Sequence, residues 1–240
     1  MRFDAVIFDN DGLLLETEGA WTLAERRLFA RFGIEFTIEH KREILGKAGP
    51  LAEEALARLL DRPAEGPVLF RELQGLALEE IGRTAKPRPG AVELLAALSE
   101  RGYALGLASN STRAFVDRAL AGAAVSAASF AASLTCDEVT NPKPAPDVYL
   151  GVCEALRVAP ARTCVLEDSP TGVAAARAAG CYVIGVPSIE GVVLDGADAV
   201  AGSLAQAAPL IDPELGGTAL ERGDHELDVL VERDPEGGGR

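Results

Sequence analysis

The sequence predicts an α/β fold, a doubly wound parallel sheet that carries a small all-helical unit inserted after its first strand. Short apolar runs that suit buried strands alternate with helical patterns over much of the chain. The first apolar run stands apart from the others, because the residues that follow it show helical periodicity alone. With 240 residues, 48% of them apolar, the chain can bury a large core and still carry an insert.

The first strand and the helical insert come first along the chain. The apolar run DAVIF predicts a strand at residues 4–8 that is buried on both faces and ends at Asp9. A glycine-containing loop follows, and from about Glu18 the apolar positions recur at helical spacing. Further helical patterns cover residues 37–45, 50–61 and 67–84. We therefore predict a helical cap domain at residues 18–84 and a core domain at residues 1–17 and 85–212.

The rest of the core returns to alternating helices and strands. We predict helices at residues 91–102, 146–157, 171–180 and 203–210, and strands at residues 103–109, 163–168, 181–186 and 198–200. A variable stretch at about 112–135 receives no assignment. Residues 213–240 contain eight acidic residues, three arginines and a terminal GGGR, so we expect a disordered acidic tail there.

Charge and cysteine content limit the possible partners. The formal net charge is −14, and so acidic a surface repels nucleic acid and anionic membranes, so we expect neither as a partner. No run approaches the ~18 apolar residues of a membrane span, and the N-terminal MRFDAVIFD lacks the apolar run of a signal peptide. Four cysteines without a CxxC pair indicate buried thiols in a reducing compartment. We therefore expect a cytoplasmic protein, with a monomer as the default.

Side chains that suit phosphate chemistry follow the predicted strands, at the carboxyl edge where open parallel sheets bind ligands. Asp9 and Asp11, in the sequence DNDG, place two carboxylates after the first strand, where their mutual repulsion favours a bound cation such as Mg²⁺. Ser109 and Asn110 come at the end of the second strand and precede a helix. Hydroxyl and N–H groups in that position suit phosphate binding, although helix capping is their commoner use.

Two further features complete this group. In NPKPAPD the prolines stiffen the chain and fix where Lys143 projects, which is useful where charge develops on phosphate oxygens. Glu167 and Asp168 come at the end of a later strand, where an acid would complete a metal site opposite Asp9. Each feature alone has an ordinary explanation as an acidic turn, a helix cap or a solvated lysine. Their occurrence in this order at successive strand ends favours an active site.

The motifs FDNDGLL, LASNS, NPKPAPD and LEDSPTGVAAARAAG resemble those of the haloacid dehalogenase (HAD) superfamily, and the resemblance covers residues 3–210. The chain is most similar in pattern to the helical-cap branch of β-phosphoglucomutase-like and phosphoglycolate phosphatase-like enzymes. The resemblance implies a Rossmann-like core and Mg²⁺-dependent hydrolysis of phosphate monoesters of small metabolites. It implies that Asp9 is the nucleophile that forms an aspartyl-phosphate, and that Asp11 is the acid and base.

The resemblance also assigns roles to the other motif residues. It implies that Ser109 and the Asn110 amide bind phosphoryl oxygens, and that Lys143 neutralises nucleophile and phosphate. It implies Mg²⁺ ligation by the motif residues Asp9, Asp168 and, through its carbonyl, Asp11. Glu167 would contact the metal through a water molecule, or would support the direct metal ligands without touching the metal.

The cap leaves alternatives open. Gly46 suggests a close backbone approach at a loop tip, so we predict that Lys47 contacts substrate, with a solvated lysine as the alternative. Trp21 stands where β-phosphoglucomutase-like proteins have a histidine, and Gly49 where they have an arginine, which disfavours a phosphomutase. Trp21 belongs to the cap core in our preferred interpretation. A non-catalytic binding or regulatory protein on the same fold is the remaining alternative, and the presence of every motif residue argues against it.

Overall fold

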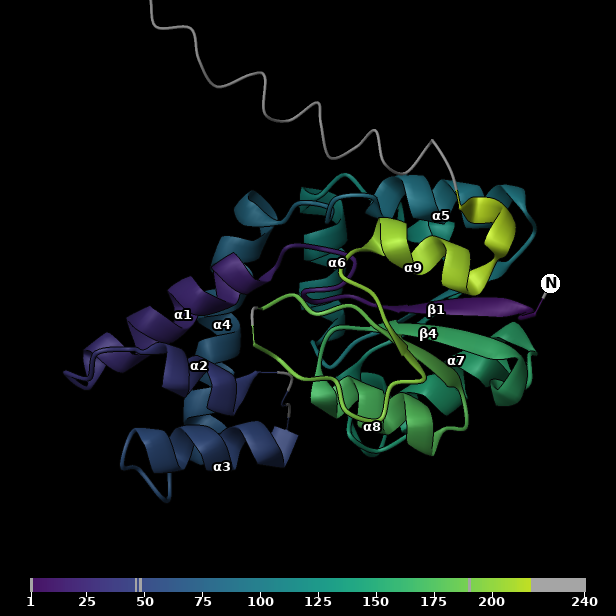
Figure 1. The fold of residues 1–240 in the computed structure, drawn as a ribbon. Coiled ribbons are helices and arrows are strands. Elements are labelled where there is room, and N and C mark those ends of the chain that lie inside the picture. Colours follow the sequence, from purple (N-terminus) through teal and green to yellow (C-terminus); the bar gives the residue numbers. More distant parts are fainter. Residues whose placement is uncertain (1, 46, 48, 190, 217–240) are drawn as a thin grey trace, which may run out of the picture.

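A parallel sheet with helices on both faces and a helical cap beyond one end make up the fold (Figure 1). The computed structural model describes residues 2–45, 47, 49–189 and 191–216. Within these residues the six-stranded sheet has the order β3-β2-β1-β4-β5-β6, and every neighbouring pair is parallel. The strands are β1 (Ala5–Asp9), β2 (Ala104–Ala108), β3 (Ala132–Leu134), β4 (Thr163–Glu167), β5 (Tyr182–Gly185) and β6 (Ala199–Val200). The predicted fold class is confirmed.

Two helical layers cover the sheet and explain the apolar sequence of its central strand. Helices α5 (Ala91–Glu100), α6 (Arg113–Gly122) and α9 (Leu204–Ile211) cover one face, and α7 (Asp147–Leu156) and α8 (Pro170–Ala178) cover the other (Figure 1). Val6 and Phe8 of β1 belong to the first apolar cluster, whereas Ile7 belongs to the second. Because β1 is buried on both sides, its sequence shows an apolar run rather than alternation.

The cap consists of α1 (Glu18–Arg31), α2 (Ile38–Ile44), α3 (Gly49–Leu59) and α4 (Gly66–Thr84). Its apolar faces pack together, with α4 against both α1 and α3, and bury Leu28, Leu56 and Leu73 completely. Helix α4 also packs against α6 of the core. The predicted all-helical insert after the first strand is confirmed, and the domain boundaries themselves stay a prediction.

The two linkers between core and cap run side by side. The Glu16 N–H donates to the Lys86 carbonyl at 2.7 Å, and the Arg88 N–H donates to the Leu14 carbonyl at 2.9 Å. Between these bonds, Leu15 and Pro87 form an antiparallel bridge. The chain therefore leaves the core and returns to it through one paired segment.

No element bounds are predicted from the sequence for the variable stretch at 112–135, and the structure orders it into α6 and β3. Strand β3 has three residues, Ala-Ser-Leu, too short to show a period, and alanine and serine dominate the segment before it. A 3-10 turn at Pro213–Leu215 begins the predicted tail, whose residues 217–240 lie outside the described residues, so the tail stays a prediction. No helix in the described ranges combines the length and the hydropathy needed to cross a membrane.

Candidate active site

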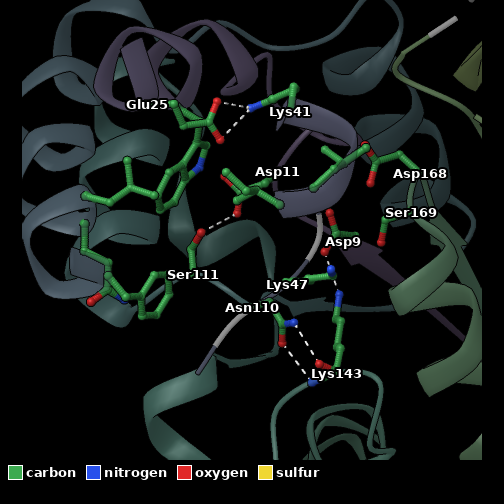
Figure 2. A pocket seen from close by; sticks show the side chains of 16 residues that line it. Asp9, Asp11, Glu25, Lys41, Lys47, Asn110, Ser111, Lys143, Asp168 and Ser169 are labelled. Atoms are coloured by element: carbon green, nitrogen blue, oxygen red, sulfur yellow. Dashed lines mark hydrogen bonds and ion pairs between the residues drawn. The ribbon is translucent and has the colours of Figure 1, made fainter. Parts of the chain in front are cut away.

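Asp9 and Asp11 lie at the carboxyl end of β1, facing the cap (Figure 2). Gly12 turns the chain directly after them with φ = +79°, a conformation that side-chain-bearing residues rarely adopt. A Cβ at this position would lie 2.2 Å from Asp168 Oδ2. Glycine therefore allows the loop after β1 to approach the acidic residue that follows β4.

Lys143 joins the ends of β1 and β4. Its Nζ donates to Asp9 Oδ1 and to Glu167 Oε1, both at 2.6 Å, and to the Ala108 carbonyl at 3.0 Å. Burial lowers the pKa of Lys143, but the two carboxylates outweigh it and hold that pKa above its ordinary value. The ammonium of Lys143 therefore stays charged. Burial raises the pKa of Asp9, and the Lys143 ammonium opposes that shift.

Asn110 anchors the segment that carries Lys143. The Lys143 N–H donates to Asn110 Oδ1 at 2.9 Å, and Asn110 Nδ2 donates to the Lys143 carbonyl at 3.1 Å. These two bonds hold the loop after β2 against the proline-rich segment. The Asn110 side chain thus positions Lys143, while the phosphate contact predicted for its backbone amide stays a prediction.

Glu167 lies at the end of β4, is fully buried, and accepts hydrogen bonds on both carboxylate oxygens. Its Oε1 accepts from Lys143 and from the Tyr149 hydroxyl, the latter at 2.5 Å. Its Oε2 accepts from the N–H groups of Asp168 and Ser169 and from the Ser169 hydroxyl. Gly172, in the first turn of α8, makes room, since a Cβ there would lie 1.7 Å from Glu167 Oε1.

The serines after β2 hold one oxygen of Asp11. The Ser109 and Ser111 hydroxyls donate to Asp11 Oδ2 at 3.0 Å and 2.8 Å. The other oxygen, Asp11 Oδ1, has no hydrogen-bond partner among the described residues. Ser111 lines the pocket, whereas Ser109 is fully buried beneath it, so the phosphate contact predicted for Ser109 stays a prediction.

A cavity of about 80 Å³ lies between these residues and the cap (Figure 2). Lys47, for which a substrate contact is predicted, lines it, and Gly46 lies outside the described residues. Trp21 also lines it and stacks on Phe115 of α6 with ring centroids 4.9 Å apart, so Trp21 lies where cap and core meet. The core contributes Asp9, Asp11, Asn110, Ser111, Lys143 and Asp168, and the cap contributes Trp21, Glu25, Lys41, Lys47, Phe70 and Gln74, among others.

Two residues at the site, Ser188 and Arg88, are not predicted from the sequence. Ser188 donates to Asp168 Oδ2 at 2.5 Å. The Arg88 guanidinium donates to the carbonyls of Gly12, Val186 and Pro187 at 2.6–3.3 Å, and so ties the returning linker to two loops of the site. Neither residue stands in a motif, and each reaches the site from a distant part of the chain. No local signal in the sequence distinguishes them.

The acidic residues fit a divalent cation. Asp9, Glu167 and Asp168 present carboxylate oxygens that all lie within 4.8 Å of one another. An all-oxygen donor set is what Mg²⁺ prefers. Both Glu167 oxygens already accept hydrogen bonds, so Asp9 and Asp168 are better suited to direct contact with a metal than Glu167.

A capped parallel sheet with paired aspartates, a buried lysine and a metal-suited acidic group at its carboxyl edge defines a class, the capped α/β phosphohydrolases. The family model described as haloacid dehalogenase-like hydrolase matches residues 3–180. The chain belongs to this haloacid dehalogenase-like hydrolase family, which confirms the predicted family. Phosphatases named among its relatives confirm the predicted class of enzyme, a HAD-like phosphatase.

Two relatives and one solved structure support this family membership. The protein CbbY of Rhodobacter capsulatus is 33% identical over 232 residues, which cover 90% of this chain and all of that protein. A phosphorylated carbohydrates phosphatase of Thermotoga maritima is 32% identical over 215 residues, which cover 88% of this chain and 95% of that protein. The crystal structure of CbbY from Rhodobacter sphaeroides in complex with phosphate matches with a TM-score of 0.74 and 28% identity, covering 85% of this chain and 96% of that one.

Proposed function

We propose that this protein hydrolyses phosphate monoesters of small metabolites with the help of Mg²⁺, through an aspartyl-phosphate on Asp9. The contact of Lys143 with both Asp9 and Glu167, at the base of a pocket roofed by the cap, carries the proposal. A protein with a net charge of −14 repels an anionic ester, so the site needs positive charge of its own. The charged Lys143 supplies it where a phosphoryl group would lie.

The chemistry divides between the two aspartates. An Asp9 oxygen attacks phosphorus, and the alcohol oxygen leaves with a proton from Asp11. The ionised Asp11 then takes a proton from a water molecule that attacks the phosphorus, which releases phosphate and restores Asp9. Because Ser109 and Ser111 hold Asp11 Oδ2, we assign the proton transfers to Asp11 Oδ1. Ser109 and Asn110 remain the proposed contacts for the phosphoryl oxygens.

Asp9, Asp168 and the Asp11 carbonyl would hold Mg²⁺, which when bound neutralises charge on the phosphoryl oxygens. Ser188 fixes one oxygen of Asp168, and the charged Lys143 fixes one oxygen of Asp9. Glu167, bonded to Lys143 and Tyr149, keeps the lysine in place behind these ligands. Ser188, Lys143 and Glu167 thus hold the carboxylates of Asp168 and Asp9 in fixed directions before substrate arrives.

The pocket supports a small substrate. A cavity of about 80 Å³ is far smaller than the sites that enclose drug-sized ligands. The Thermotoga maritima relative is named as a phosphatase of phosphorylated carbohydrates, which supports a substrate among phosphorylated small metabolites. A mutase must bind the second phosphate of its bisphosphorylated intermediate, and arginine is the side chain best suited to that contact. None of the described lining residues is an arginine, which favours hydrolysis over a mutase reaction.

Phosphate release from a panel of phosphate monoesters tests the proposal. We expect activity with Mg²⁺, its loss with a chelator and its return when Mg²⁺ is restored. Asp9→Asn should lower kcat at least about a thousandfold. The matched control is Asp195→Asn, the same change at an exposed position, which should leave kcat unaltered. Activity that survives chelation or Asp9→Asn would contradict the mechanism, and conversion of a sugar phosphate without phosphate release would favour the mutase.

A further inference from the structure

A buried ion pair lies in the cap wall of the pocket, outside the groups that the proposed chemistry uses (Figure 2). Lys41 Nζ of α2 donates to both carboxylate oxygens of Glu25 of α1, at 3.0 Å and 3.2 Å. Glu25 is 2% exposed and Lys41 5% exposed, and both line the pocket. Fully charged side chains of these two types are seldom buried to this degree.

Stability alone does not account for the pair. Removing two charges from water costs several kcal/mol for each ion, and apolar residues of similar volume are often equally or more stabilising in such a place. Most of the surrounding cap wall is apolar and includes Trp21, Ile44, Phe70 and Leu73, while Lys47 and Gln74 are its other polar members. A few polar groups set in an apolar wall are what orients a ligand in a binding pocket.

The charges of the pair indicate which ligand group it suits. The pair has no net charge and places an ammonium donor beside a carboxylate acceptor. A hydroxyl group both donates and accepts, so it matches both members of the pair. A second phosphate or a carboxylate would meet the repulsion of Glu25 together with the attraction of Lys41, and would lose its hydration for little gain.

We propose that the Glu25–Lys41 pair selects phosphate esters whose alcohol part is neutral and hydroxylated, and rejects esters that carry a second anionic group. This inference rests on the proposed function. It makes Glu25 and Lys41 specificity-determining residues that face the alcohol part of the substrate, while Asp9 and Lys143 act at the phosphoryl group.

Three probes of equal carbon number test this selection. They are n-propyl phosphate, glycerol 3-phosphate and 3-phosphoglycerate, which differ in hydroxyl content and in one carboxylate. Their binding is measured by calorimetry to the Asp9→Asn protein with Mg²⁺, so that turnover does not interfere. We expect glycerol 3-phosphate to bind at least about tenfold more tightly than either of the other two.

Substitution of the pair should change the order of affinities. Glu25→Gln removes the carboxylate that repels an anionic group beside Lys41, so 3-phosphoglycerate should gain at least about tenfold relative to glycerol 3-phosphate. Glu79→Gln, the same change at an exposed cap residue, is the matched control and should keep the original order. The uncharged double variant Glu25→Gln/Lys41→Met should bind the three esters within about threefold of one another. Thermal unfolding verifies that each variant is folded. If Glu25→Gln does not fold, the double variant alone shows whether the pair sets the order of affinities.

The outcomes separate this inference from the proposed function. Equal affinities for the three esters before substitution of the pair, or an unchanged order in both pair variants, would overturn the inference and leave the proposed function standing. Failure of the Asp9→Asn protein to bind inorganic phosphate and all three esters would overturn the proposed function, and the inference with it.

Discussion

Replacing Glu167 by glutamine tests the buried network that joins Lys143 to the end of β4. Glu167 accepts two hydrogen bonds on Oε1 and three on Oε2. A glutamine has one acceptor oxygen, so in either orientation its NH₂ group faces at least two donors in a fully buried site. Each buried donor left without an acceptor costs about 1–3 kcal/mol. Because Lys143 also loses one of its two anionic partners, we expect a loss of about 3–5 kcal/mol in the free energy of unfolding.

Urea denaturation followed by circular dichroism measures this loss. A chelator is present throughout, so that metal binding does not contribute to the measured stability. Glu79→Gln serves as the control, because the Glu79 side chain is 61% exposed and its ion pair with Arg27 lies at the surface. The control should lose less than about 1 kcal/mol. A loss below about 1 kcal/mol in Glu167→Gln would refute the reasoning that Glu167 holds this network together.

Two further changes test other parts of the core. In Gly172→Ala the new Cβ would lie 1.7 Å from Glu167 Oε1, so we expect a loss of about 2 kcal/mol or more in urea denaturation. Gly75→Ala, whose Cβ would meet nothing within 4 Å, should instead stabilise α4 by up to about 1 kcal/mol, and equal effects would contradict the steric argument. Burial raises the pKa of Asp212, but hydrogen bonds from the Glu214 N–H and Arg101 outweigh it and hold that pKa below its ordinary value. A lowered folded-state pKa stabilises the protein above the unfolded value of about 4, and this stabilisation is lost as the pH falls through the folded-state pKa. The urea midpoint should therefore fall more steeply below about pH 4 in the native protein than in Asp212→Asn, and parallel curves would contradict this assignment.

The strand-end residues of the site were predictable because a parallel sheet imposes their meeting. Asp9 is the last residue of β1 and Glu167 the last residue of β4, and neighbouring parallel strands end at the same edge. Lys143 follows no strand directly, yet the prolines around it indicated a fixed direction, and its Nζ does reach both carboxylates. Motif order and sheet geometry therefore predicted that Asp9 and Glu167 would meet, whereas Lys143 needed the rigid proline-rich segment as well.

The supporting groups were not predictable, because their placement depends on packing between distant segments. Ser188 lies 20 residues beyond Asp168 and meets it only once the chain has passed through α8 and β5. Glu25 and Lys41 are 16 residues apart on two helices, and each alone looks like a charged residue on a solvated helix face. Strand β3 escaped for a different reason, since three residues are too few to show a period.

The paired linkers have a consequence for how this protein could acquire a new substrate. Their pairing between Leu14–Glu16 and Lys86–Arg88 relies on main-chain hydrogen bonds, which almost any sequence can form. The cap begins and ends at this one point, so an exchange of its four helices as a block needs only two junctions. Such an exchange must also preserve the packing of α4 and Trp21 against α6 of the core. Recombination at these linkers would give the pocket a new cap wall while Asp9, Lys143 and Asp168 stay in the core. The paired linkers are therefore the positions at which we expect caps to be grafted between relatives.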